Sequence, residues 1–472
     1  MTTKDNFDQW YQSGLLTSDE MQTMDALKTS NNGLMEAQFY KNLEFGTGGL
    51  RGIIGLGTNR INRFTVRRAT QGIANYLNAD NMNQEKKVVI AYDTRHYSKD
   101  FALETALVFA ANGIKVYLFS EETPTPILSF GVRYLNADVG VVITASHNPK
   151  NYNGYKVYNN LGGQVTLDMA TSLQKEINAL DVFKDVKTID FKSAIFNGQL
   201  EYIDQLIFDA YDKLLLEHSF KKPEHSNLKV IYTPIHGSGL NPVVRLLKKK
   251  GYAFDLVDAQ STMDGDFPTV IYPNPEEKEA LKLAVKLALK KDADIVLGTD
   301  PDADRVGVVV KHQGSMHYLN GNEIGVLLLD FILNNRENSK NDYIVKTIVT
   351  SDLGDVIAKA KGVGVVNTLT GFKFIGEQIE KLTLHNKNFI FGFEESYGYL
   401  KDTFVRDKDA VMSSIMIADM AAYYKSKELT LVDVLNQIYE TYGYYMNALD
   451  TLVFDGVEGI SLMTSKLKSI KT

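Results

Sequence analysis

The sequence contains no cysteine among its 472 residues. This absence excludes disulfide bonds, thiolate catalysis and zinc held by cysteine, so a nucleophile or a metal ligand has to come from other side chains. Positive charge is scarce as well, because 51 lysines and arginines stand against 58 aspartates and glutamates, giving a formal net charge of -7. Nucleic acids and anionic membranes are polyanions, so the charge balance favours neither as a partner.

Long apolar runs are also missing. No stretch reaches the roughly 18 apolar residues that a membrane-spanning helix needs. The polar residues 1–8 are not followed by an apolar segment of signal-peptide type. We therefore expect a soluble, cytoplasmic protein without nucleic-acid or membrane partners, and the sequence does not indicate its oligomeric state.

Segments typical of strands and of helices alternate through most of the chain, which indicates an α/β fold with mixed, mainly parallel sheets. The length predicts about three domains. We expect three similar consecutive α/β domains around a central cleft, with linkers near residues 191–199 and 312–319. The predicted domains are residues 1–200, 201–315 and 316–440, followed by a remnant of a fourth domain at 441–472.

Each of the three units ends in a buried strand that leads into a polar loop. The strands are expected at residues 139–143, 293–297 and 388–391. In open α/β sheets, ligands bind beyond the carboxyl ends of the strands. The three loops are therefore predicted to meet at one active site.

An acidic loop follows the second of these strands. Asp300, Asp302 and Asp304 are spaced by two residues, so an extended backbone would place their carboxylates on one side, where a hard cation such as Mg²⁺ or Ca²⁺ would relieve their repulsion. A calcium EF-hand is excluded, because Arg305 and Lys311 occupy the positions that require Gly and Glu. An acidic surface turn and an aspartyl-phosphate nucleophile of haloacid-dehalogenase type remain alternatives for this loop.

A serine loop follows the first strand. Ser146 could act as a nucleophile or phosphoryl carrier, with His147 and Lys156 supplying proton transfer and positive charge. The G-x-S-x-G pattern of a hydrolase nucleophile is absent. Residues 144–149 taken alone also fit an ordinary capped turn.

Two further stretches could contact a phosphorylated ligand. The glycine-rich Gly46–Gly52 could present backbone N–H groups and Arg51 to a phosphate. The loop Gly392–Gly398 follows the third strand and offers Glu394 and Ser396 as hydrogen-bond partners for hydroxyl groups.

Taken together and in this order, the loops resemble those of the α-D-phosphohexomutase superfamily, from about residue 44 to about residue 445. Thr144–Pro149 resembles the phosphoserine loop, Asp300–Arg305 the metal loop and Gly392–Gly398 the sugar-binding loop. Thr370–Lys373 and Arg406–Asp409 resemble two more elements of the substrate cleft.

The resemblance implies a role for each matching residue. Ser146 would carry the phosphoryl group and, with the three aspartates of the acidic loop, coordinate Mg²⁺. Arg51, His147 and Lys156 would stabilise charge or move protons beside the serine. The implied substrate-binding residues are Arg305, Gly371, Phe372, Lys373, Glu394, Ser396, Arg406 and Lys408.

The resemblance also implies a reaction. The Gly-Phe-Glu-Glu-Ser-Tyr-Gly loop is more similar to that of glucose-phosphate mutases than to the phosphomannomutase form. We therefore expect interconversion of α-D-glucose 1-phosphate and glucose 6-phosphate through a bisphosphorylated sugar, with glucose 1,6-bisphosphate as activator. The alternatives are a phosphomannomutase or phosphopentomutase, a phosphatase, and a catalytically silent sugar-phosphate-binding protein.

Members of this superfamily carry a fourth domain with an Arg-x-Ser-Gly-Thr-Glu-Pro loop that clamps the distal phosphate. The last arginine here is Arg406, so residues 441–472 lack this loop, and we expect a truncated, weakened mutase that leaks some phosphate to water.

Fusing such a domain to the C-terminus should raise kcat/KM for glucose 1-phosphate sharply in a steady-state assay. An unchanged kcat/KM would contradict this expectation.

Overall fold

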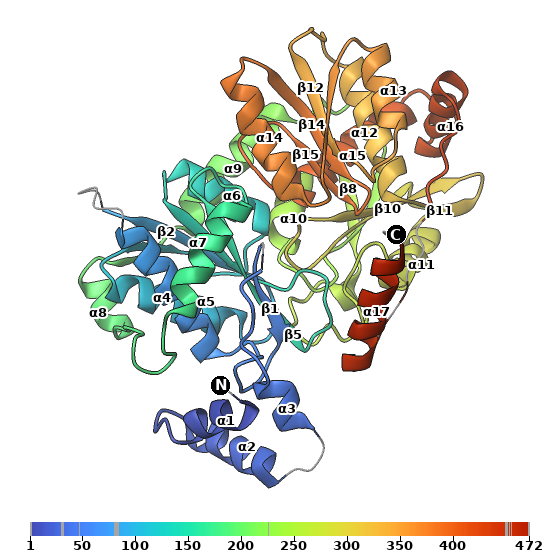
Figure 1. The fold of residues 1–472 in the computed structure, drawn as a ribbon. Helices are drawn as coiled ribbons and strands as arrows, with labels where there is room; N and C mark the ends of the chain where they lie inside the picture. The colour runs from blue at the N-terminus through green and yellow to red at the C-terminus, as the bar shows by residue number, and fades with distance from the viewer. Residues whose placement is uncertain are drawn as a thin grey trace.

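A computed structural model describes residues 2–29, 33–46, 48–79, 85–224, 226–448, 452, 454 and 456–470. It shows three α/β units, each built on a mixed sheet, with three N-terminal helices packed on the outside of the first (Figure 1). In every sheet the antiparallel pairings lie toward one edge. The architecture is the one predicted from the alternation of strands and helices.

The first unit has a six-stranded sheet in the order β1-β5-β4-β2-β3-β6. Along β2, Val88 and Ile90 pack into the core formed with α4 and α5, whereas Val89 and Ala91 pack into the core formed with α6. Alternate side chains of a strand point to opposite faces, so helices cover both sides of this sheet. Its elements are β1 Gly49–Ile53, α4 Arg63–Ala79, β2 Lys87–Tyr92, α5 Ser98–Ala111, β3 Lys115–Leu118, α6 Thr125–Tyr134, β4 Val139–Ile143, β5 Tyr152–Asn159, α7 Leu167–Asn178, α8 Phe191–Phe196 and β6 Leu200–Tyr202.

The second unit has a five-stranded sheet in the order β11-β10-β9-β7-β8. Strand β9 lies in the middle of the sheet, is buried throughout, and leads directly into the acidic loop. Its elements are α9 Asp204–His218, β7 Lys229–Thr233, α10 Leu240–Lys249, β8 Ala253–Leu256, the short 3₁₀ helix Asp258–Gln260, α11 Lys278–Lys291, β9 Ile295–Thr299, β10 Val306–His312 and β11 Ser315–Leu319.

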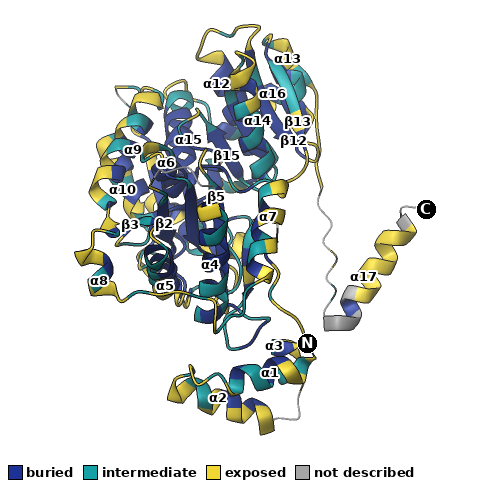
Figure 2. Cartoon of the chain, turned by 60° about the vertical axis from the view of Figure 1, so that its left-hand side comes forward, coloured by how far each residue is buried: buried dark blue, intermediate teal, exposed yellow. Residues whose placement is uncertain are grey.

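The third unit has a four-stranded sheet in the order β13-β12-β14-β15. Helix α15 is buried along most of its length, because it packs against β9, β10 and α10 of the second unit as well as β15 and α12 of its own (Figure 2). The elements are α12 Gly321–Asn334, β12 Asp342–Thr347, α13 Leu353–Ala360, β13 Gly364–Thr368, α14 Phe372–Leu384, β14 Asn388–Glu394, β15 Gly398–Lys401, α15 Ala410–Lys425 and α16 Leu431–Tyr442, with α17 Gly456–Ile470 beyond them.

The N-terminal helices α1 (Thr3–Tyr11), α2 (Ser18–Thr29) and α3 (Leu34–Phe39) form a small aromatic cluster on the first unit. The Trp10 ring packs edge-on against Phe64 of α4 at 5.1 Å between centroids. Among the described helices, none combines the length and apolarity needed to cross a membrane.

The two segments predicted as linkers are parts of the domains. Residues 191–196 form α8, and residues 312–319 include the turn and second strand of the β10–β11 hairpin. The predicted boundary after residue 200 falls inside β6, because this edge strand pairs with β3, which is distant in the chain. The boundary after residue 315 falls inside β11, which pairs with β10 across the turn Gln313–Gly314.

Asp419 of α15 joins the second and third units. Its buried carboxylate accepts hydrogen bonds from Lys250 Nζ at 3.0 Å and from the Tyr252 hydroxyl at 2.6 Å. Burial raises the pKa of Asp419 to about 6, although both partners oppose the shift. The folded protein therefore binds a proton more tightly at this carboxyl than the unfolded chain does.

This shift predicts a pH dependence of stability. Because the folded-state pKa of Asp419 lies above its unfolded value, the contribution of this carboxyl to stability falls as pH rises from about 4 to about 6, by up to about 3 kcal/mol. Asp419→Asn should flatten this part of the curve, as measured by denaturant unfolding at a series of pH values. A variant whose curve runs parallel to that of the parent would contradict the prediction.

Candidate active site

Ser146 lies in the loop between β4 and β5, where the buried strand β4 ends. Its side chain is almost completely buried, and its φ of 52° places it in the left-handed region that non-glycine residues rarely adopt. Its hydroxyl donates to Asp300 Oδ2 at 2.9 Å and lies 3.3 Å from His147 Nδ1. The structure therefore brings the predicted nucleophile directly to the predicted metal loop.

The acidic loop follows β9, and its three carboxylates converge to within 4.8 Å of one another. An extended backbone was expected to place the three carboxylates on one side, but the backbone of this loop is not extended. Ala303 has a φ of 49° and its N–H donates to Asp300 O at 3.0 Å, so the loop is a tight turn. Asp300 Oδ1 in turn accepts the backbone N–H groups of Asp304 and Arg305, which fixes that turn from within.

These residues fit a hard cation. All three aspartates are buried, and Asp302 Oδ1 and Asp304 Oδ1 accept no hydrogen bond from any described residue. Burial and the two neighbouring carboxylates raise the pKa of Asp300 well above its usual value. Clustered carboxylate oxygens beside a serine oxygen form the all-oxygen ligand set that Mg²⁺ and Ca²⁺ prefer.

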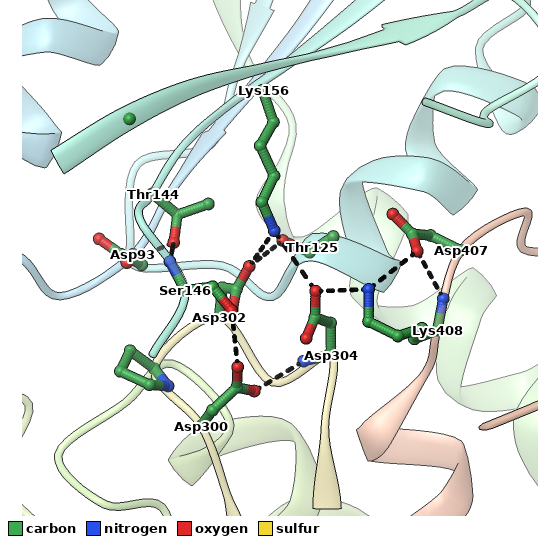
Figure 3. Close-up of polar contacts among 12 residues, drawn as sticks. Asp93, Thr125, Thr144, Ser146, Lys156, Asp300, Asp302, Asp304, Asp407 and Lys408 are labelled. Atoms are coloured by element: carbon green, nitrogen blue, oxygen red, sulfur yellow. Dashed lines mark hydrogen bonds and ion pairs between the residues drawn. The ribbon is translucent and has the colours of Figure 1, made fainter. Parts of the chain in front are cut away.

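Two lysines from other units contact the same carboxylates (Figure 3). Lys156 of β5 donates to Asp302 at 2.7 Å and to Asp304 at 3.3 Å, and Lys408 of the third unit pairs with Asp304 at 3.1 Å. Burial alone would raise the pKa of Asp304, but the two lysines and Arg305 hold it well below its usual range.

His147 is neutral in this environment. Burial, which is the main cause, and the charges of Arg305 and Arg51 together lower its pKa to about 3. The neutral imidazole is a hydrogen-bonding neighbour of the Ser146 hydroxyl.

A cavity of about 250 Å³ lies in front of the serine. Four cationic side chains line it, and Arg51 is also hydrogen-bonded to Asn148 at 3.1 Å. Such a lining suits a phosphate group. The lining residues are Gly48, Gly49, Leu50, Arg51, Ser146, His147, Lys156, Gln164, Asp304, Arg305 and Lys408.

The glycine-rich stretch, which could present backbone N–H groups and Arg51 to a phosphate, is mostly strand β1 in its described part, and its residues 48–51 line the cavity. Gly49 pairs with Lys156, and a Cβ at Gly49 would lie 1.9 Å from Tyr155 O. Glycine is thus required where β1 approaches β5, and the strand carries Arg51 to the edge of the cavity. Thr47 lies outside the described residues.

The predicted sugar-binding residues form a second group around Glu394, at the end of β14. The buried Glu394 carboxylate accepts a hydrogen bond from the Gly371 N–H at 2.9 Å. The Lys408 Nζ lies 5.7 Å from the centroid of the Phe372 ring. Burial raises the pKa of Glu394, opposed by Lys408. Lys373 lies over the Phe374 ring, and Ser396 lies half-buried in the turn after β14.

Arg406 has a different environment from the other predicted substrate-binding residues. Its guanidinium pairs with Glu380 of α14 at 2.6 Å and donates to the backbone carbonyls of Thr403 and Val405. It is not among the residues that line the cavity. In this structure Arg406 fixes the loop before α15.

Several residues that hold the site together are not among the predicted site residues. Thr125 donates to Asp302 at 2.8 Å, Glu276 pairs with Arg305, and Asp407 accepts from the Tyr158 hydroxyl at 2.8 Å. Asp93 and Arg95 hold the serine loop. Both follow the end of strand β2, so the rule about polar loops at strand ends could have identified them.

Comparison with known proteins agrees with this arrangement. Residues 42–182, 201–314 and 320–442 match domains I, II and III of the family described as phosphoglucomutase/phosphomannomutase, alpha/beta/alpha. A phosphoglucomutase of Staphylococcus saprophyticus is 37% identical over 95% of this chain and 81% of its own. One from Staphylococcus aureus is 40% identical over 92% of this chain and 77% of its own.

Solved structures show the same fold. A phosphoglucomutase/phosphomannomutase family protein from Burkholderia thailandensis superposes with a TM-score of 0.68 at 20% identity, covering 84% of this chain and 79% of that one. The phosphoglucomutase parafusin from Paramecium gives 0.67 at 18% identity, covering 86% and 76%.

The fold and the site define a phosphosugar mutase of the α-D-phosphohexomutase superfamily. Within it, the chain belongs to the phosphoglucomutase/phosphomannomutase family. The predicted superfamily and the predicted three-domain α/β fold are thereby confirmed.

The acidic loop yields a binding prediction. Asp302→Asn removes one anionic ligand, so Mg²⁺ should bind at least about tenfold more weakly, which is the lower end of the cost of losing even an outer-shell partner. Isothermal titration with Mg²⁺ measures this. Asp294→Asn is the matched control, because Asp294 pairs with Lys425 outside the loop; equal affinities for the two variants would contradict the assignment.

Proposed function

We propose that this protein is a phosphoglucomutase that interconverts α-D-glucose 1-phosphate and glucose 6-phosphate by way of a phosphorylated Ser146. The observation that carries the proposal is the position of the Ser146 hydroxyl, buried and 2.9 Å from Asp300, beside a cation-lined cavity. The names of the staphylococcal relatives support glucose phosphate as substrate.

Each residue around the serine has a proposed part in phosphoryl transfer. Phosphorylated Ser146 transfers its phosphoryl group to the free 6-hydroxyl of glucose 1-phosphate, which gives glucose 1,6-bisphosphate. The serine then recovers the phosphoryl group from the 1-position, which releases glucose 6-phosphate. His147 and Lys156 are placed to accept and donate the protons that these steps move. Arg51 and Arg305 neutralise phosphate oxygens, which is the main contribution a protein makes to this chemistry.

Mg²⁺ is the proposed cation, held by Ser146 and the three aspartates of the acidic loop. When bound, it would supply charge stabilisation to the phosphoryl oxygens. The unpartnered oxygens of Asp302 and Asp304 support its binding there. Glucose 1,6-bisphosphate is the proposed activator, because it would restore the phosphoserine after any loss of phosphate.

The sugar is proposed to lie between the serine and the third unit. Glu394 and Ser396 would accept and donate hydrogen bonds to ring hydroxyls, and the Gly371–Lys373 turn would close over them. Lys408 would contact the substrate phosphate, and Arg406 would act from outside the cavity by holding its loop. The cytoplasmic location expected from the sequence remains a prediction.

A mutase and a phosphatase differ in what receives the phosphoryl group from Ser146, a sugar hydroxyl or water. The names of the staphylococcal relatives support a sugar as the acceptor. We therefore expect more isomerised sugar than free phosphate.

The test is a coupled assay of glucose 6-phosphate formation from glucose 1-phosphate, with Mg²⁺ and catalytic glucose 1,6-bisphosphate. Ser146→Ala removes the phosphoryl acceptor and should lower kcat by at least about a thousandfold. Ser172→Ala on α7 is the control, since its hydroxyl only contacts the Asp168 carbonyl, and it should match the parent protein.

Free phosphate is measured in the same reactions. Release of phosphate without isomerised sugar would indicate a phosphatase. Full mutase activity in Ser146→Ala would refute the phosphoserine mechanism.

A further inference from the structure

One arginine holds the loop that carries Ser146. Arg95 lies in the turn after β2 and is 3% exposed. Its Nη1 donates to the carbonyls of Pro149 at 2.8 Å and Tyr152 at 3.2 Å, and its Nη2 donates to those of Ser146 and Asn148. A single guanidinium thus connects four carbonyl oxygens along the whole serine loop.

Asp93 holds both Arg95 and Thr144, the residue two positions before Ser146. Its buried carboxylate lies 3.3 Å from Arg95 Nε, accepts the Arg95 backbone N–H at 3.0 Å and accepts the Thr144 hydroxyl at 2.6 Å. The Thr144 oxygen in turn accepts the Ser146 N–H at 2.8 Å. The backbone of Ser146 is therefore held through its N–H by Thr144 and through its carbonyl by Arg95.

Ser146 needs such support because of its conformation. A φ of 52° is unfavourable for a residue with a Cβ and persists only where the surroundings fix it. The same conformation directs the hydroxyl to Asp300. Loss of the carbonyl contacts would let the loop relax and move the hydroxyl away from the acidic loop.

The second unit covers Arg95 from the other side. The Phe267 ring lies 5.0 Å from the guanidinium carbon, and a Cβ on Gly265 would lie 2.7 Å from the His96 nitrogen. The guanidinium is packed between the serine loop and the unit that carries Asp300. Arg95 does not line the cavity, so it is placed to act on the loop and not on the substrate.

We propose that Arg95, with Asp93 and Thr144, is the positioning residue that holds the Ser146 hydroxyl at the acidic loop for phosphoryl transfer. This inference rests on the proposed phosphoglucomutase function. It assigns no contact with the sugar to Arg95.

The test compares Arg95→Lys with Arg68→Lys. A lysine ammonium cannot span the four carbonyls. Arg68 is the matched control, since it also donates to backbone carbonyls of the first unit, those of Ile177 and Asn178, away from the serine loop. The rate of Ser146 phosphorylation by glucose 1,6-bisphosphate is followed by intact-protein mass spectrometry, alongside kcat for glucose 1-phosphate.

We expect both rates to fall about 100-fold in Arg95→Lys, the cost of a displaced reacting group, and to stay at the parent level in Arg68→Lys. Added methylguanidinium should restore part of the activity of Arg95→Ala but not of Ser146→Ala. A purely structural role would instead lower the unfolding midpoint of Arg95→Lys with little change in the rate per folded molecule, and that result would overturn the proposal.

A second pair of variants covers the case in which Arg95→Lys does not fold. Thr144→Val removes the oxygen that accepts the Ser146 N–H and should slow phosphorylation, whereas Thr144→Ser keeps it and should be close to the parent. Equal rates in this pair would overturn the proposal.

If the parent protein neither isomerises the sugar nor gains a phosphate, the proposed function fails and this inference fails with it.

Discussion

The compensation of charge at one buried acidic loop organises the whole molecule. Asp300, Asp302 and Asp304 are removed from water, and such carboxylates are stable only when cations and hydrogen-bond donors surround them. The chain supplies Lys156 from the first unit and Lys408 from the third. The loop itself belongs to the second unit, so satisfying its charge requires all three units to meet at one point.

Further hydrogen bonds and ion pairs connect the third unit back to the first. Lys408 is held by Asp407, whose carboxylate also accepts the Tyr158 hydroxyl of β5 and the Gln164 amide. Strand β5 of the first unit carries both Tyr158 and Lys156, so this series of contacts begins and ends in the first unit. The relative positions of the units, and thereby the shape of the cavity, are set by the same groups that neutralise the acidic loop.

The sequence was informative where a local pattern determines the chemistry. Buried strands followed by polar loops located Ser146 and the acidic loop, because strand ends are where α/β folds place ligands. It was uninformative where function depends on backbone direction. The convergence of the aspartates depends on the left-handed Ala303, and the role of Arg95 depends on where the carbonyls of the serine loop point. The β10–β11 hairpin was also missed, although its two-residue turn Gln313–Gly314 is a local signal that lies between two strand-like segments.

We propose that loops from the three units meet around a single divalent cation beside Ser146. Anomalous diffraction from crystals grown with Mn²⁺, a stand-in for Mg²⁺, tests this most directly. We expect one strong peak among the carboxylates of Asp300, Asp302 and Asp304, next to the Ser146 oxygen. A peak elsewhere in the molecule, or none at the acidic loop at saturating Mn²⁺, would contradict it.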